Sequence, residues 1–312
     1  MRCTHEPRLG HPAAMAYEEL ETVASWIACS AERREAIAKE IAVSSGLELE
    51  RVAPFAREDL PLASFFGLDG LMRFVLVPGG EIELGLSDTE VRALESLAAP
   101  HRESPTFEAD WGVLLRADHP WRGTRRVRVA PMLFAQGSLG EFPPSGWRKE
   151  IGEFFVGEGG DVSVLPEDLD EGLARFGFRL PREAEWEHAA RGGRVGALTY
   201  VGDVTPDKRL LRKLRIALED SEGRTEDRHA SIANDFGLLG FGVHAELCLD
   251  RFDGADPTEG VVPYEERVIR GGAGATYPWQ NPGEQHALLT ASRQPAHGLV
   301  EAIGVRVVRS LG

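Results

Sequence analysis

Cysteine and histidine are the residues of this sequence that could act as nucleophiles or hold a redox metal, and both are widely scattered. The chain contains three cysteines, Cys3, Cys29 and Cys248, and no CxxC pair. A disulfide framework or a cysteine zinc site needs closer spacing, so we expect three reduced, structural thiols. None of the nine histidines has another histidine four residues away, the spacing of a helical metal site. We expect surface or core imidazoles, and leave open a trio that meets only in the folded chain.

A second group of residues suits recognition more than catalysis. The stretch near the C-terminus carries aromatic, amide and basic side chains, namely Tyr277, Trp279, Asn281, His286 and Arg293. Such side chains contact a large surface at a modest entropic cost. They predict a surface that binds a ligand or a partner. The alternative is that Tyr277 and Trp279 only cover the core.

A basic segment stands out in this acidic chain. Thr205, Pro206 and Asp207 are typical of a helix start. The helix predicted over 207–218 has leucines on one face, and its other face carries Lys208, Arg209, Arg212 and Lys213. One interpretation is a docking surface for an acidic protein partner. The other is a solvated face that pairs with the protein's own carboxylates.

Composition excludes several classes of protein. The 312 residues carry a formal net charge of −15, with 42 % hydrophobic and 27 % charged residues, which is typical of a globular chain. A general nucleic-acid binder has a basic surface, so we expect no nucleic-acid partner. No apolar run reaches the roughly 18 residues of a membrane span, and the start of the chain does not resemble a secretory signal. We therefore expect a cytoplasmic protein with no membrane partner.

The predicted elements form a mixed α+β pattern. Apolar spacing predicts two helices over 16–45, the second one capped by Ser30 and ended by Gly46. We expect residues 1–69 to be a tail and a short helical extension, and residues 70–312 to be the main domain. Residues 73–78 and 81–84 predict a hairpin that turns at 79–80. Further strands are expected at 126–129, 268–269 and 305–308.

A helix is predicted over 182–191, opened by Pro181 and closed by two glycines. It can bury the ring of Trp186. Its three glutamates, Glu183, Glu185 and Glu187, are expected to stay solvated or to pair with Arg179 and Arg191. This interpretation makes the helix an organiser of the core rather than a catalytic element.

Several motifs in order resemble the formylglycine-generating enzyme (sulfatase-modifying factor) family. They are Phe74-Val-Leu-Val-Pro-Gly-Gly80, Phe178-Arg-Leu-Pro-Arg-Glu-Ala-Glu-Trp-Glu-His-Ala-Ala-Arg-Gly-Gly193, Asn234-Asp-Phe-Gly-Leu238, Glu246-Leu-Cys-Leu-Asp250, Arg267-Val-Ile-Arg-Gly-Gly272 and Ile303-Gly-Val-Arg-Val-Val308. The first resembles the opening hairpin of the family, and the second resembles its most specific signature. The resemblance implies an irregular, C-type-lectin-like fold over 70–312, with a groove formed by the C-terminal loops.

The same resemblance bears on the chemistry. The aerobic enzymes of the family oxidise a substrate cysteine with two cysteines that hold copper, between the Arg-Gly-Gly strand and the last strand. Copper(I) needs soft thiolate ligands, and the corresponding stretch here, 273–303, contains no cysteine. Relatives that use iron hold it with three histidines and an extra helical bundle, for which the N-terminal helices here are too few. The resemblance therefore implies that the copper-cysteine reaction is lost.

The resemblance also implies a degraded calcium loop. The family uses a side-chain oxygen where Gly240 stands, backbone carbonyls near Gly242 and His244, and a carboxylate at Glu246. Only Glu246 keeps a side-chain donor, and calcium usually needs six or more oxygens. We predict no cofactor, with calcium at Glu246 as the alternative.

These observations lead to one hypothesis and two alternatives. The hypothesis is a divergent family member without the catalytic cysteine pair, a pseudoenzyme that serves as a binding or scaffold module for a protein partner. The first alternative is a metal-dependent oxidoreductase of the same family with a non-cysteine site. The second is a subunit of a larger assembly that docks through its N-terminal helices.

Overall fold

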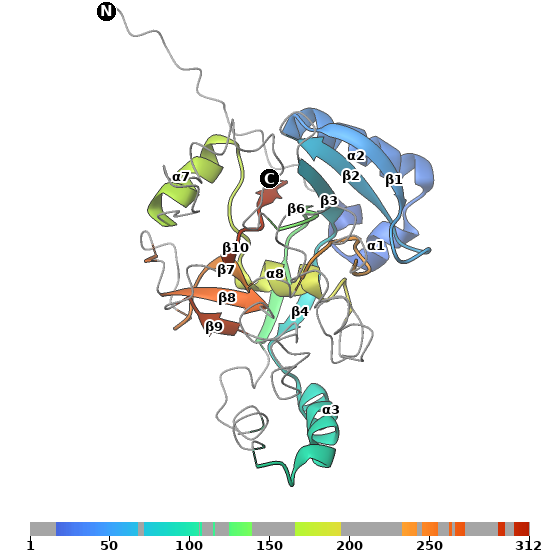
Figure 1. The fold of residues 1–312 in the computed structure, drawn as a ribbon. Helices are drawn as coiled ribbons and strands as arrows, with labels where there is room; N and C mark the ends of the chain where they lie inside the picture. Colours follow the sequence, from blue (N-terminus) through green and yellow to red (C-terminus); the bar gives the residue numbers. More distant parts are fainter. Residues whose placement is uncertain are drawn as a thin grey trace, which may run out of the picture.

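The computed structural model describes most of the predicted elements and leaves part of the chain undescribed (Figure 1). The described residues are 17–67, 72–105, 107, 115, 125–138, 166–194, 233–241, 245–254, 262–263, 266–271, 293–296 and 303–311. Every structural statement below concerns these residues. Among them, no helix combines the length and the apolar character that crossing a membrane requires.

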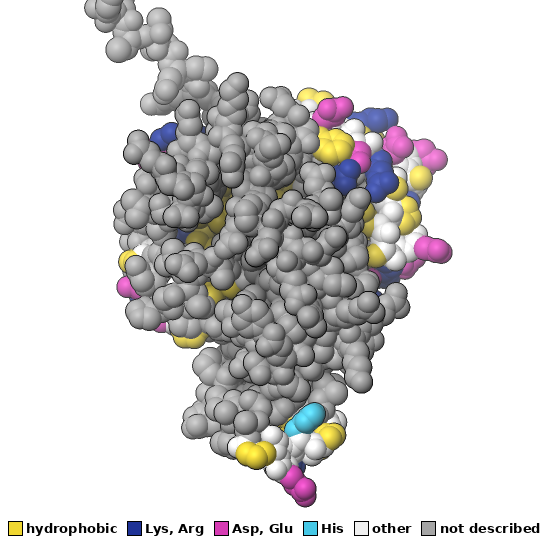
Figure 2. Space-filling view, viewed as in Figure 1, with side chains coloured by type: hydrophobic (Ala, Val, Ile, Leu, Met, Phe, Trp, Pro, Cys, Tyr) yellow, Lys and Arg dark blue, Asp and Glu magenta, His cyan; other side chains and the backbone are white. Residues whose placement is uncertain are grey.

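The N-terminal helices form where the sequence predicts them. A short turn, η1 (Glu18–Leu20), precedes α1 (Val23–Ala28) and α2 (Ala31–Ser45). The Ser30 hydroxyl accepts a hydrogen bond from the Arg33 amide, and Gly46 ends α2 at φ 67°, a left-handed conformation that glycine adopts without strain. The outer surface at α2 and β1 carries charged side chains of both signs (Figure 2).

The N-terminal extension is not only helical, which corrects the prediction. It continues as β1 (Glu48–Pro54) and β2 (Pro61–Gly67). The register of β1 shifts between Leu49 and Arg51, so one residue is left out of the pairing, as in a β-bulge. Because of that bulge, Leu49 and Val52, three residues apart in sequence, pair with Phe65 and Ala63, which are two residues apart on β2. The three-residue spacing resembles that of a helix and hides the alternation of a strand.

The two N-terminal strands belong to a five-stranded antiparallel sheet. Its order is β1-β2-β3-β6-β11, with β3 (Met72–Val77), β6 (Met132–Ala135) and β11 (Val308–Ser310). Since β2 pairs with β3, the sheet runs across the boundary predicted at residues 69 and 70. The division into domains at residues 69 and 70 remains a prediction. The five-stranded sheet contains strands from both sides of it.

The predicted hairpin over 73–84 is wrong in its pairing. Both strands form, but β4 (Gly80–Leu84) pairs with β5 (Arg125–Val129) and not with β3. Gly79 lies at the point where the chain passes from one sheet to the other. Its amide donates to the Leu20 carbonyl over 2.8 Å, and a Cβ there would lie 2.5 Å from the Val129 carbonyl oxygen. Only glycine fits this crossing.

An insertion lies between β4 and β5. It contains α3 (Asp88–Ala98) and η2 (Ala99–His101), which lie apart from the two larger sheets (Figure 1). Ser87 and Glu90 form a capping box at the start of α3. The helix therefore begins with its first amides satisfied.

The C-terminal half of the chain forms a second, four-stranded sheet of order β10-β7-β8-β9. Its strands are β7 (Ala245–Arg251), β8 (Arg267–Gly271), β9 (Arg293–Pro295) and β10 (Ile303–Gly304). Two helices precede it, α7 (Pro166–Arg175) and α8 (Glu183–Ala190). The signature helix α8 is confirmed, and it contacts β4, β5, β7 and β8.

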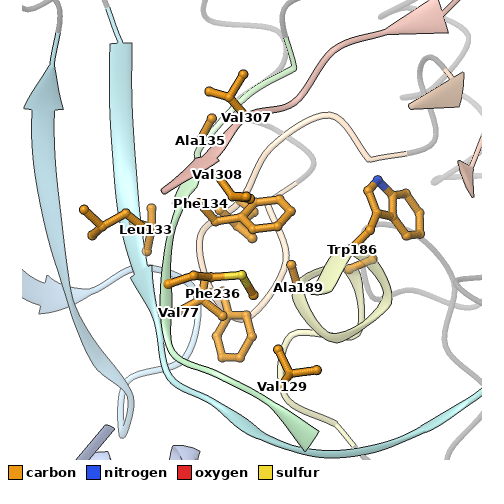
Figure 3. Packing of buried hydrophobic residues seen from close by; sticks show 14 of the residues in the cluster. Val77, Val129, Leu133, Phe134, Ala135, Trp186, Ala189, Phe236, Val307 and Val308 are labelled. Carbon is orange, nitrogen blue, oxygen red and sulfur yellow. The ribbon is translucent and has the colours of Figure 1, made fainter. Parts of the chain in front are cut away.

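One apolar cluster joins the five-stranded sheet to α8. Phe74 stacks on Phe178 with ring centroids 5.0 Å apart, and Trp186 meets Phe241 edge-on at 5.1 Å. Figure 3 shows Phe134 and Phe236 in this cluster, together with Trp186 and Ala189 of α8. Trp186 is fully buried, as the sequence predicts.

Candidate functional site

The starts and ends of the C-terminal strands meet within two neighbouring rows of the sheet. Ala245, which begins β7, pairs with Gly271 at the end of β8 and with Ile303 at the start of β10. Arg293, which begins β9, pairs with Arg270. The connection over 272–292 therefore leaves and re-enters the sheet at this one edge, which we call the loop edge.

Of the predicted recognition residues, only Arg293 lies among the described residues. Tyr277, Trp279, Asn281 and His286 belong to the 272–292 connection and lie outside the described residues. Arg293 is the first residue of β9, so the backbone of one predicted residue is fixed at the edge itself. The basic residues Lys208, Arg209, Arg212 and Lys213 also lie outside the described residues.

Arg270 anchors the end of β8 beneath the loop edge. Its side chain is 1 % exposed. Its guanidinium donates to the carboxylate of Glu183 over 3.1 Å and to that of Glu187, both on α8. It also lies 5.3 Å from the ring centroid of Trp186, within the range of a cation–π contact. Charge-assisted hydrogen bonds of this kind fix direction as well as distance.

Glu187 shares its charge between two arginines. Arg191, the residue after α8, lies 2.7 Å from Glu187 and 2.7 Å from Glu90 of α3. Burial alone lowers the pKa of Arg191, but the two carboxylates raise it overall. Glu187 also accepts from the Gly85 amide over 3.2 Å. A continuous buried network, which we call the α8 network, thus runs from the insertion through Glu187 to the loop edge.

The glutamates of α8 were predicted to be solvated or paired, and pairing is what the structure has. Glu187 is 0 % exposed and Glu183 is 3 % exposed. Glu185 pairs with Arg179 over 2.7 Å, as predicted, and Glu187 pairs with Arg191. The solvated alternative is wrong for all three, because α8 is enclosed by strands on several sides.

Glu246, the predicted metal ligand, is surrounded by donors. Its two carboxylate oxygens accept hydrogen bonds from Arg306 over 2.6 and 2.9 Å. Trp186 donates to the same carboxylate over 2.6 Å. A metal ion at Glu246 would have to displace these donors.

Burial favours the neutral forms of two further groups near α8, His188 and Cys248. Burial lowers the pKa of His188, whose Nε2 donates to the Pro78 carbonyl over 2.8 Å. Of the surface and core positions expected for the histidines, His188 therefore has a core position. Burial also raises the pKa of the Cys248 thiol, which favours the unreactive thiol over the nucleophilic thiolate. Within the described part of the chain, no group of three His, Cys, Asp or Glu side chains could hold a metal ion.

Comparison with known proteins places this geometry in a family. The model of the sulfatase-modifying factor enzyme 1-like domain matches residues 138–311, more than half of the chain. The chain belongs to the sulfatase-modifying factor family. This confirms the family resemblance and the α+β, C-type-lectin-like fold class predicted from the motifs.

The match to the sulfatase-modifying factor domain begins after β6 and contains α8, the four-stranded sheet and the loop edge. One similar solved structure is Treponema denticola variable protein 1, at 14 % sequence identity and a TM-score of 0.42. That similarity covers 76 % of this chain and 95 % of the Treponema protein. The search of curated proteins gave no match.

Two arginines that organise this sulfatase-modifying factor domain were missed as functional residues. Arg270 and Arg306 each lie between valine, isoleucine or glycine neighbours in a strand-like run. A charged residue inside such a run must be buried with a partner or lie at an edge. The sequence therefore indicates that Arg270 needs a buried partner, and the structure shows that the partners are the glutamates of α8.

Proposed function

We propose that this chain is a binding or scaffold module whose recognition surface is the 272–292 connection. The supporting observation is the loop edge, where the two ends of this connection meet on the neighbouring strands β8 and β9. Only one of its 21 residues is charged, Glu284, in a chain that is 27 % charged. Aromatic and amide side chains without charge suit the central part of a protein interface.

The proposal includes loss of the copper-cysteine reaction. No cysteine follows Cys248 in the sequence, and copper(I) needs soft thiolates. Cys248 is no substitute, because it is fully buried and its pKa is raised. The chain is therefore proposed to be a pseudoenzyme.

A second docking surface is proposed at the basic segment 207–218, for an acidic region of the protein partner. We propose a cytoplasmic location, because Cys29 and Cys248 are free thiols. Unpaired cysteines are typical of proteins in reducing compartments.

Loss of the copper reaction can be tested directly. The purified protein would be loaded with copper(I) and incubated in air with a peptide that contains one cysteine. Competition with a copper(I) chelator would measure binding, and mass spectrometry would measure the peptide. We expect no stoichiometric copper and no oxidation of the cysteine to an aldehyde. Copper binding at one ion per chain, together with that oxidation, would overturn the proposal.

The recognition surface can be tested by comparing a substitution in the 272–292 connection with a control substitution at an exposed position on α2. Tagged wild type, Trp279→Ala and Val43→Ala would be purified from cells, and co-purifying proteins measured by quantitative mass spectrometry. Val43, on α2, is 85 % exposed and serves as the control. We expect a partner that is depleted at least tenfold by Trp279→Ala and retained by Val43→Ala. Equal recovery with all three proteins would remove the 272–292 connection as the recognition surface.

A further inference from the structure

Arg306 lies between β10 and β11 with its side chain fully buried. All five of its N–H donors have oxygen acceptors. Nε and Nη2 donate to the two oxygens of Glu246, Nη2 also donates to the Leu239 carbonyl over 2.8 Å, and Nη1 donates to the carbonyls of Ala135 and Gln136 over 3.2 and 2.8 Å. The face of the guanidinium is covered by the ring of Phe241, with 4.2 Å between the guanidinium carbon and the ring centroid.

The oxygens around Arg306 come from three separate parts of the chain. Ala135 and Gln136 stand at the end of β6, Leu239 belongs to the 233–241 segment, and Glu246 belongs to β7. Three neutral carbonyls and one carboxylate form a set that a hard cation could bind. Here a planar guanidinium fills it, with two parallel hydrogen bonds to the carboxylate.

We propose that the Arg306 guanidinium is the permanent cation of this oxygen cluster, and that no calcium ion binds at Glu246. The calcium ligands implied by the family resemblance do not fit this chain. Gly240 offers no side-chain oxygen, and both oxygens of Glu246 already accept from Arg306. A divalent ion would also place two further positive charges beside a buried guanidinium, where the repulsion is weakly screened.

Under this proposal, Arg306 links the segments that a bound metal ion could otherwise link. Its hydrogen bonds connect β6 and the 233–241 segment to β7, and the first residue of β7 lies at the loop edge. The role is independent of any partner that the 272–292 connection binds. It predicts that calcium chelation leaves the fold intact.

Terbium luminescence on the wild-type protein tests the absence of calcium. Terbium(III) replaces calcium in oxygen sites and emits when a nearby tryptophan is excited. Trp186, which lies 2.6 Å from the Glu246 carboxylate, would report an ion there. We expect no terbium luminescence that calcium abolishes and that requires Trp186. Any terbium luminescence that is observed should be equal in the wild type and in Trp186→Phe. A calcium-displaceable signal that disappears in Trp186→Phe would overturn the proposal.

A pair of arginine substitutions tests the role of the guanidinium. Lysine keeps the charge but has three donors in place of five, so Arg306→Lys should lower the unfolding temperature by about 5 °C or more. The control is Arg309→Lys, three residues further along, which we expect to shift it by less than about 1 °C. The unfolding temperatures of both variants would be measured in calcium and in EDTA. The shift of each variant relative to wild type should be the same in the two solutions. An unchanged unfolding temperature for Arg306→Lys would contradict the proposed role.

Discussion

The two large sheets are held in place by different kinds of contact. In the five-stranded sheet the buried side chains of β3 and β6 are mostly apolar, with Phe74, Val75 and Phe134 fully covered. In the four-stranded sheet, β7 and β8 bury charged side chains, including Glu246, Arg267 and Arg270. Apolar burial is non-directional, whereas a buried ion pair is favourable only in a particular geometry.

This difference separates two tasks. The apolar sheet supplies stability that depends mainly on the area removed from water. The charged sheet carries the loop edge, at which the 272–292 connection, the proposed recognition surface, begins and ends. We infer that the α8 network keeps this edge in one arrangement, and that damage to it should disturb the edge more than equal damage elsewhere.

The largest effect is expected from Glu187→Gln. The substitution removes the charge that Arg191 and Arg270 share, and removal of one partner from a buried ion pair costs about 3–5 kcal/mol. We expect the free energy of unfolding to fall by about 4 kcal/mol, measured by urea denaturation. Amide hydrogen exchange over 266–271 should also become faster.

The matched control for that change is Glu171→Gln. Glu171 pairs with Arg175 one turn away on α7, and both side chains are more than 60 % exposed. Such a pair contributes no more than about 0.5 kcal/mol. If both glutamine variants lost the same stability, the α8 network would have no special role.

Phe74→Ala is the corresponding test of the apolar sheet. Phe74 is fully buried and stacked on Phe178, so the lost ring leaves a cavity and should cost about 3 kcal/mol. The rate of amide hydrogen exchange at 266–271 should increase only by the amount that the lower global stability accounts for. Faster exchange at the loop edge than in the Glu187→Gln variant would reverse the comparison between the two sheets.

A smaller effect is expected from pH, through His188. Burial lowers the pKa of His188 in the folded state below its usual value, so the unfolded chain binds a proton more readily. Stability is therefore complete above the unfolded pKa near 6.5 and falls as the pH drops below it, by at most about 1.4 kcal/mol per pH unit.

His188→Gln isolates that dependence. Glutamine can still donate to the Pro78 carbonyl but does not titrate. The stability of the His188→Gln variant relative to wild type should therefore improve as the pH falls from roughly 6.5 to 5.5. Urea denaturation at several pH values measures the difference. A constant difference over this range would mean that His188 does not titrate differently in the folded and unfolded states.

Much of this fold could be predicted from the sequence, because local signals agree with the final structure. Ser30 and Gly46 mark the ends of α2, and Pro181 with the glycines at 192–193 marks α8. The pairing of strands could not be predicted in the same way. β4 pairs with β5 across the insertion, a contact between residues about 45 positions apart, and the crossing at Gly79 depends on tertiary contacts with Leu20 and Val129.

Part of the candidate site could likewise be predicted from the sequence, and part could not. The residues of the 272–292 connection were selected by their type, and the sheet brings the two ends of that connection together at the loop edge. The α8 network was only half predicted, since the glutamates were identified but Arg270 and Glu90 were not. Their partners lie on elements distant in sequence, and composition alone does not say which elements meet.

The smallest effect is expected at Asp250, at the far end of the α8 network. Asp250 accepts a hydrogen bond from the Glu183 amide, but burial, together with the charge of Glu183, raises the pKa of Asp250 in the folded state. A raised pKa means that this group favours folding below the unfolded value near 3.8 and that the benefit is lost as the pH rises. Asp250→Asn is neutral and still accepts the bond, so it should stabilise the protein at pH 7 by about 0.5–1 kcal/mol. The gain should vanish below about pH 4, and the exposed control Asp253→Asn should show none. A loss of stability at pH 7 would mean that the charge of Asp250 strengthens its bond to α8 by more than its burial costs.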